Sequence, residues 1–593
     1  MESSSFSKMP RFSASGNSSS NQGWMAARLE ANVEILSYYA ISLTVLIAIF
    51  IVGHWTRRLA WNASRSTILY PIVAISRILR KGLLRRLSGF TSIGHAVLVL
   101  AFVGLNALFS FYRVDYSKIS NIAARFGWMA TGNLAFVVFL ALKNTPLAIL
   151  TVYSYERLNS LHQIAGYTTL LYTILHGALY TYYFMMTGKT NVLHEDVVTA
   201  GIILGFAMFF TVFAGMTLQR LKYELFYVIH LALFVVIVVT LGLHRPTLES
   251  EKTLIVTIVI ASLWVSDRLI RVGRLAFNGI NNEATIFPLP NGGTRVVVKK
   301  SIIRARPGKH CYVWLPHIRA FETHPFTIVA TEPLELIINT HSGFTRDLHR
   351  YAHQNPGASL TVSVEGPYGT FPDPMEYDKV VLVAGGSGAT FTVGLAADMI
   401  QRMHLDSAKQ IEFIWVSRNR DNIDWFTQHL NHLLTHQCAP KIGLKIHLTR
   451  VKRLEKIEPS APISRLSSQI FTVRESDPAS DTEKGTESPE LSTERSSIAI
   501  REEDPEKHDT LSSVNSIEVN PSTTSGLRLP IRYGRPDIET SVREAILSMN
   551  KNERVLVAAC GPPGLVNVVR NTTASCISVD GPSVELHCEQ FGW

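Results

Sequence analysis

Charged residues are scarce in this chain. Of its 593 residues only 18% are Asp, Glu, Lys or Arg, whereas 47% are hydrophobic; a soluble globular protein has about a quarter charged residues. A single compact soluble domain is therefore excluded. Apolar blocks long enough to cross a membrane recur up to about residue 275, and shorter, strand-length runs follow. This distribution predicts a membrane part followed by a soluble part.

Cysteine is also scarce. The five cysteines all lie after residue 310 and form no C-x-x-C pair, which argues against a disulfide framework or a zinc site. This usage predicts a reducing, cytosolic location for the soluble part. The Ser-rich amino terminus lacks the short apolar core and cleavage site of a signal peptide, so we expect residues 1–32 to be a disordered extracytosolic tail.

A membrane domain is predicted over residues 33–275, with about seven spans. The expected spans are Val33–Gly53, Ile93–Tyr112, Trp128–Leu147, Leu158–Met185, Val198–Leu218, Glu224–Leu243 and Lys252–Ile270. The loop Arg57–Arg86 after the first span is rich in arginine and has no acidic residue, which predicts that it faces the cytosol. The soluble part then also faces the cytosol. The net charge of +10 is thus mainly an orientation signal, and we expect no nucleic-acid partner.

Four histidines within the predicted spans form a repeated pattern. His162 and His176 lie fourteen residues apart on one span, and His230 and His244 have the same spacing on another. Fourteen residues of helix rise about 21 Å and return to nearly the same face. This pattern predicts two stacked His–His sites, His162 with His230 and His176 with His244, typical of bis-histidine haem. Packing histidines, a zinc site or a proton relay are the alternatives.

The soluble part begins with features of a small antiparallel barrel, predicted over residues 276–372. Short β-like runs alternate with turn residues at Thr294–Lys299, Cys311–Leu315, Leu334–Asn339 and Leu360–Val364. Two motifs lie in this region, H-P-F-T-I at residues 324–328 and G-P-Y-G at residues 366–369. Alone, such Pro and Gly residues indicate only turns.

Residues 373–593 are predicted to form a doubly wound α/β domain. A buried apolar strand at residues 380–384 runs into G-G-S-G-A-T at residues 385–390, and an amphipathic helix follows, as in a phosphate-binding turn. Further strands are expected at Gln410–Val416, Leu444–Leu448 and Arg554–Ala559. Arg418 follows one of them and suits a 2′-phosphate or a solvated loop. Residues 456–527 are polar and poor in aromatics, which predicts a disordered insertion.

An ordered set of motifs runs along the chain: the paired histidines, HPFTI, GPYG, GGSGAT, WVSR (residues 415–418), GRPD (534–537) and CGPPG (560–564). With this set the chain resembles the fungal ferric-chelate reductases of the flavocytochrome b superfamily, which also includes NADPH oxidases. The resemblance implies a transmembrane haem bundle followed by a ferredoxin-reductase-like module. It implies FAD, two b-type haems and NADPH as electron donor. Haem iron would be bound by His162, His176, His230 and His244.

The resemblance also assigns roles to residues of the soluble part. Those implied to bind FAD are His324, Pro325, Phe326, Thr327, Gly343, Thr345, Gly366 and Gly369. Those implied to bind NADPH are Gly385, Gly386, Gly388, Thr390, Arg418, Arg535, Cys560, Gly561 and Pro562. Thr327, Cys560 and Trp593 are implied at the reacting centre, with Phe591 as the alternative to Trp593 for the aromatic residue near the flavin.

The activity implied is electron transfer from cytosolic NADPH through FAD and both haems to extracytosolic ferric chelates, with cupric ion as a further acceptor, in support of iron uptake. The partners are membrane lipid, these acceptors and an iron permease or oxidase. A plasma membrane location is expected, with the vacuolar membrane as the alternative. Two other functions stay open, an NADPH oxidase that reduces oxygen to superoxide and a non-catalytic membrane cytochrome or transport protein regulated by nucleotide.

Overall fold

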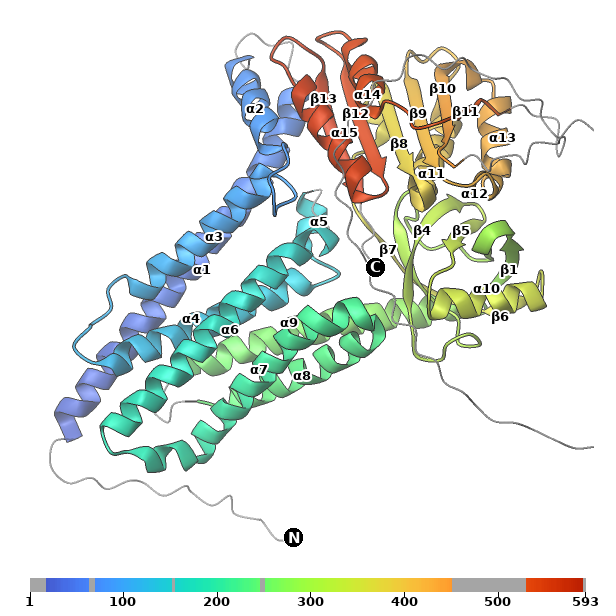
Figure 1. The fold of residues 1–593 in the computed structure, drawn as a ribbon. Helices are drawn as coiled ribbons and strands as arrows, with labels where there is room; N and C mark the ends of the chain where they lie inside the picture. Colours follow the sequence, from blue (N-terminus) through green and yellow to red (C-terminus); the bar gives the residue numbers. More distant parts are fainter. Residues whose placement is uncertain (1–17, 63–69, 152–154, 246–250, 451–528, 590–593) are drawn as a thin grey trace, which may run out of the picture. The chain divides into compact units, whose positions relative to one another are not determined.

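The computed structural model describes residues 18–62, 70–151, 155–245, 251–450 and 529–589. Within these ranges a series of long helices precedes two β-sheets (Figure 1). The predicted fold class, a helical membrane bundle followed by an antiparallel flavin-type barrel and a doubly wound α/β domain, is confirmed. The insertion predicted at 456–527 lies outside the described residues.

Each predicted span overlaps a long helix, although the span predicted at Trp128–Leu147 runs past the end of its helix at Ala141. The helices are α1 (Ser18–Asn62), α3 (Ile93–Phe111), α4 (Ile119–Ala141), α6 (Tyr155–Met186), α7 (Asp196–Leu221), α8 (Tyr223–Leu243) and α9 (Glu251–Gly279). Within the described residues, six of these helices are long and apolar enough to cross a membrane. The exception is α6, which has the required length but carries many Tyr, Thr and His side chains. Two short helices, α2 (Tyr70–Leu83) and α5 (Pro146–Leu150), were not predicted.

The boundary of the amino-terminal tail was predicted wrongly. Helix α1 begins at Ser18 rather than near Val33, so residues 18–32 are helical. Tertiary contacts stabilise this extension: the Lys118 ammonium lies 4.0 Å from the centre of the Trp24 ring, and Arg125 Nε donates a hydrogen bond of 2.6 Å to buried Asn32 Oδ1. These contacts join residues about ninety positions apart, a relation that local composition does not encode.

A buried polar triad joins the first three long helices. Asn133 of α4 donates to Asn106 Oδ1 of α3 at 2.7 Å, and Tyr39 of α1 donates to Asn133 Oδ1 at 2.9 Å. Asn106 in turn donates to the Tyr39 hydroxyl at 3.1 Å. In an apolar environment each of these groups would be costly to leave unpaired, so the closed triad specifies how α1, α3 and α4 pack.

The first sheet is antiparallel and has the strand order β6-β1-β2-β5-β4-β3-β7. Its strands are β1 (Glu283–Leu289), β2 (Gly293–Val298), β3 (His310–Trp314), β4 (His324–Thr331), β5 (Leu334–Asn339), β6 (Ser359–Thr361) and β7 (Ser363–Tyr368). Helix α10 (Phe344–Gln354) packs against it through buried Phe344 and Leu348. The HPFTI motif, read in sequence as a turn signal, is the first half of β4.

The second sheet is parallel and has the order β11-β10-β9-β8-β12-β13. Its strands are β8 (Lys379–Gly385), β9 (Gln410–Ser417), β10 (Ile442–Leu448), β11 (Ile531–Tyr533), β12 (Arg554–Cys560) and β13 (Ser583–Glu589). Its main helices are α11 (Ala389–Arg402), α13 (Thr427–Thr435), α14 (Ile538–Leu547) and α15 (Pro563–Cys576). The first two pack in one hydrophobic cluster and the last two in another, which makes the sheet doubly wound. Short α12 (Asp421–Asp424) precedes α13.

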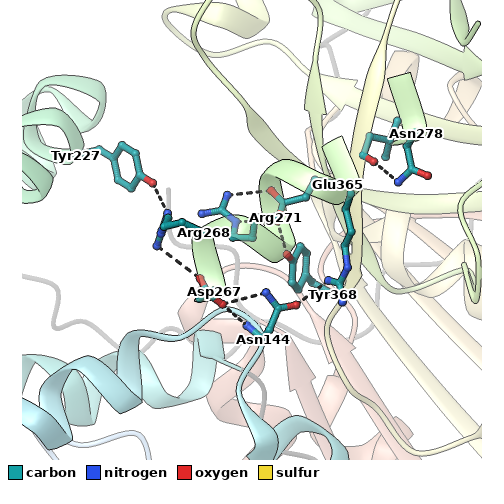
Figure 2. Close-up of polar contacts among 10 residues, drawn as sticks. Asn144, Tyr227, Asp267, Arg268, Arg271, Asn278, Glu365 and Tyr368 are labelled. Carbon is teal, nitrogen blue, oxygen red and sulfur yellow. Dashed lines mark hydrogen bonds and ion pairs between the residues drawn. The ribbon is translucent and has the colours of Figure 1, made fainter. Parts of the chain in front are cut away.

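A buried ion pair joins the last long helix to the barrel (Figure 2). Arg271 of α9 donates from Nε and Nη2 to the two carboxylate oxygens of Glu365 in β7, at 2.7 and 2.9 Å. The Tyr368 hydroxyl donates to the same carboxylate. Burial alone would raise the pKa of the Glu365 carboxyl, but the hydrogen bonds and charge of Arg271 outweigh it and hold this pKa below its usual range.

Neighbouring polar contacts extend this junction to the loop after α4. Asn144 donates from its backbone N–H and its side chain to Asp267 Oδ1 of α9, both at 2.9 Å. Arg274 of α9 donates to Asn144 Oδ1 at 2.7 Å. Helix α9 therefore binds both the barrel and the end of α4 through side chains of one short segment.

We expect Arg271→Met to destabilise this junction. Removing one member of a buried ion pair leaves the other charge unpaired and costs about 3–5 kcal/mol, so the thermal midpoint of the detergent-solubilised protein should fall. The double variant Arg271→Met with Glu365→Gln removes both charges and should unfold at a higher temperature than Arg271→Met alone. Equal midpoints for the single and double variants would contradict this account of the ion pair.

Candidate functional site

The four histidines predicted from their spacing meet in pairs between α6 and α8. The ring centres of His162 and His230 lie 6.4 Å apart, and those of His176 and His244 lie 6.0 Å apart. A metal ion held by an imidazole nitrogen on each side, at about 2.0 Å, separates the ring centres by about 6 Å. The spacing of both pairs therefore fits a metal ion held between the two imidazole rings of each pair.

Backbone carbonyls orient three of these rings. The Nδ1 atoms of His162, His176 and His244 lie within hydrogen-bond distance of the backbone oxygens of Val137 (3.0 Å), Ala123 (2.8 Å) and Val197 (2.7 Å). A carbonyl oxygen can only accept, so Nδ1 must carry the proton. The Nε2 lone pair of each ring is then available as a ligand.

Two glycines provide the space for the second pair of rings. A Cβ atom on Gly127 of α4 would lie 2.6 Å from His176 Nδ1, and one on Gly201 of α7 would lie 2.4 Å from His244 Cε1. Both distances are below van der Waals contact, so any larger residue would displace the ring. The space around the His176 and His244 rings is therefore formed by four helices, α4, α6, α7 and α8.

The residues predicted to bind FAD gather around β4 and the turn before α10. His324 stacks on Phe344 with ring centres 4.4 Å apart, and Phe326 lies next to the same ring. Thr327 is buried and lies opposite His310 on the neighbouring antiparallel strand β3. Gly343 precedes the first turn of α10, where a helix amino terminus favours an anion such as a pyrophosphate.

The remaining predicted flavin residues border this group. Thr345 accepts a hydrogen bond of 2.8 Å from the His341 N–H through its hydroxyl oxygen and so closes the turn before α10. Pro325 lies in β4, Gly366 lies within β7, and Gly369 follows it directly. A Cβ on Gly369 would lie 3.3 Å from His310 Nδ1, so this motif packs against β3.

Two glycine-rich turns meet at the carboxyl edge of the parallel sheet. A Cβ on Gly388 would lie 2.3 Å from the Cys560 backbone oxygen, and one on Gly385 would lie 2.6 Å from Pro562 Cδ. A Cβ on Gly561 would lie 2.9 Å from the backbone nitrogen of Gly385. The turns after β8 and β12 therefore need glycine for their contact, and their adjacent backbones border the crevice where a doubly wound sheet binds a dinucleotide.

Other predicted nucleotide residues lie at the same edge. Gly386 is in the first turn with φ of +58°, and Thr390 donates from its hydroxyl to the Ser387 oxygen at 3.0 Å. Cys560 ends β12, and burial raises the pKa of its thiol, which keeps it protonated at neutral pH.

Two predicted arginines and one aromatic residue complete the set. Arg418 follows β9 and Arg535 follows β11, and both are exposed. Exposed guanidinium groups at this edge are available to a phosphate. Trp593 and its alternative Phe591 lie outside the described residues.

Several residues of the site were not found from sequence. In the sequence, Gly127 and Gly201 look like ordinary glycines of apolar helices. Their role becomes visible only when the structure places His176 and His244 against them. Arg157 of α6 has Nη2 2.9 Å from Nδ1 of buried His587 in β13. The other nitrogen of His587 lies 2.7 Å from Glu589 Oε1. A partner 430 positions away leaves no local signal.

Three family models match this chain in the order of its parts. They are a ferric reductase like transmembrane component (residues 126–241), an FAD-binding domain (282–371) and a ferric reductase NAD binding domain (377–574). The chain belongs to the ferric reductase family. This family member is accordingly an integral membrane protein with an FAD-binding and an NAD-binding domain.

Two relatives of this ferric reductase family member are fungal proteins. It is 28% identical over 505 residues to a probable cell surface ferric reductase of Aspergillus oryzae, covering 78% of this chain and 64% of that protein. It is 25% identical over 411 residues to a ferric/cupric reductase transmembrane component of Schizosaccharomyces pombe, covering 60% and 71%. The chain thus spans less than two thirds of the Aspergillus relative. A ferredoxin reductase of carbazole 1,9a-dioxygenase matches 52% of this chain and 68% of its own, with 11% identity and a TM-score of 0.29.

We expect Gly201→Ala to reduce bound haem, since its Cβ would occupy the position of the His244 ring. Gly205→Ala, one turn further along α7, is the matched control because its Cβ would lie 3.8 Å from the nearest side chain. The measurement is the haem absorbance per polypeptide after purification. Gly201→Ala should lose about half of the haem, one site of two, and Gly205→Ala should keep both. Full haem content in Gly201→Ala would show that His244 is not a ligand.

Proposed function

We propose that this protein is a transmembrane oxidoreductase that carries electrons from cytosolic NADPH to ferric chelates on the other side of the membrane. The observation that supports this most is the pair of histidine sites at two depths of one helix pair. The fourteen-residue spacing along α6 corresponds to about 21 Å of helix rise, so the two sites would bridge most of an apolar core about 30 Å thick. Cupric ion is a further proposed acceptor.

The cofactors proposed for this path are FAD and two b-type haems, with NADPH as donor. When bound, the flavin accepts a hydride and the haem irons accept single electrons, which converts two-electron chemistry into one-electron transfer. His162 and His230 would hold one haem, and His176 and His244 the other. In His162, His176 and His244 the bonded Nδ1–H leaves the Nε2 lone pair available as a metal ligand.

Residues of the soluble part would bind FAD and the electron donor NADPH. His324, Pro325, Phe326 and Thr327 on β4 are proposed to bind the flavin, along with the group Gly343, Thr345, Gly366 and Gly369. Gly385, Gly386, Gly388, Thr390, Gly561 and Pro562 are proposed to admit the nucleotide pyrophosphate to the sheet edge, and Arg418 and Arg535 to bind its 2′-phosphate. Thr327 and Cys560 would lie closest to the hydride transfer, with Trp593 or Phe591 covering the flavin.

The proposed setting is the plasma membrane, with the soluble domains in the cytosol and the vacuolar membrane as the alternative. The basic loop Arg57–Arg86 supports this orientation through the positive-inside rule. In that setting the product, ferrous iron, would be available to an iron permease or oxidase. The domain division proposed is a membrane domain over residues 33–275, a flavin domain over residues 276–372 and a nucleotide domain over residues 373–593.

Intact cells that overexpress the chain should reduce external ferric chelate faster than control cells. The rate should be insensitive to superoxide dismutase, because the electrons pass to the chelate directly rather than through superoxide. A His176→Leu variant of equal abundance should lose the added activity, whereas His194→Leu, an exposed histidine after α6, should keep it. Strong inhibition by the dismutase would instead identify an NADPH oxidase.

A further inference from the structure

Helix α2 carries two opposite faces of different chemistry. One face carries Val73, Arg77 and Arg80 and is continued by Leu84 directly after the helix. The other face carries Ile75, Ile78, Leu79 and Leu83. The two faces are centred about 150° apart at 100° per residue. Such a helix has one surface for each of two neighbours.

The first face binds the NAD-binding domain. Arg77 Nη1 donates to the backbone oxygens of Val579 and Gly581, both at 2.8 Å, in the segment between α15 and β13. Arg80 Nη2 lies 2.9 Å from Glu585 Oε2 in β13. Leu84 packs into the apolar cluster of α14, α15 and β12. This face therefore binds the edge of the parallel sheet.

The second face is apolar and exposed. Ile75, Ile78 and Leu79 are 58, 62 and 57% exposed. These values match those of side chains on the spanning helices, such as Ile49 of α1 (62%) and Leu100 of α3 (68%). Exposed large apolar residues of the described barrel and parallel sheet, by contrast, stand singly along the chain. A clustered apolar face of this kind marks a surface with a partner.

Two features of the chain place this face at a lipid surface. Helix α2 lies between the spanning helices α1 and α3, with seven residues before it and nine after it. Exposed Lys81, Arg85 and Arg86 flank the apolar face, and basic residues beside an apolar helix face are typical of helices that lie in an anionic membrane interface.

We propose that α2 is an interfacial helix that lies on the leaflet nearest the NAD-binding domain, with Ile75, Ile78, Leu79 and Leu83 in the lipid. Its opposite face, through Arg77 and Arg80, holds β13 and so ties the edge of the parallel sheet to the membrane surface. This inference does not depend on the electron acceptor or on the cofactors, because it rests on α2, β13 and the two flanking spans.

Nitroxide labels on the full chain in lipid nanodiscs test the lipid contact. Single variants Ile78→Cys, Leu79→Cys and, as the polar control, Lys81→Cys would be labelled in a Cys588→Ser background, because the other native cysteines are buried. Labels at 78 and 79 should collide with oxygen several-fold more, relative to a water-soluble nickel chelate, than the label at 81. Equal access of the nickel chelate at all three positions would overturn the proposal. Shielding from both reagents with spin–spin broadening would also overturn it, because a second copy would then cover the face.

The tether is tested separately by Arg77→Ala with Arg80→Ala. Backbone amides of β13 should exchange hydrogen for deuterium faster in this variant, while a label at 79 stays in the lipid. The matched control is Lys81→Ala, which removes a neighbouring positive charge outside the described contacts with β13. Unchanged exchange in β13 would overturn the tether, and exit of the label from the lipid would show that the sheet holds the helix at the surface rather than the reverse.

Discussion

Leaving the N–H of a buried imidazole unpaired inside a membrane bundle costs free energy, and this constraint organises the helical part of the structure. Three of the four histidines meet it with a backbone carbonyl from a different helix: Val137 and Ala123 of α4 and Val197 of α7. Each such bond fixes both the ring tautomer and the distance between two helices. The packing of α4 and α7 against the histidine-bearing α6 and α8 is therefore tied to ligand geometry.

The same helices connect this bundle to the soluble domains. Arg271 in the last third of α9 pairs with Glu365 of β7, and Arg157 at the start of α6 contacts His587 of β13. Arg157 lies five residues before His162 on the same helix. A change in the packing of the parallel sheet would thus shift the start of the histidine-bearing helix α6. A change in the barrel would shift the last third of α9. Both junctions use charged groups that are largely removed from water, which favours specific geometry over adaptable contact.

Much of this architecture could be predicted from sequence because its signals are local. Span-length apolar blocks predicted the long helices, and the fourteen-residue histidine spacing predicted which rings would meet. Leu334–Asn339 was predicted residue for residue as β5. Other features depend on partners far along the chain. The start of α1 at Ser18 relies on Lys118 and Arg125, and α2 shows its two faces only when β13 is beside it. Gly127 and Gly201 have no pattern of their own, since their role is the absence of a Cβ next to a ring.

The central claim is electron transfer across the bilayer through the two histidine pairs. It is tested most directly in sealed proteoliposomes that contain the full chain with flavin and haem bound, with NADPH added outside and a membrane-impermeant ferric chelate trapped inside. The account predicts that the trapped chelate is reduced by molecules whose NAD-binding domain faces outward, and that His176→Leu abolishes this reduction while NADPH still reduces a dye added outside. Reduction of ferric chelate only on the side that holds NADPH would contradict it.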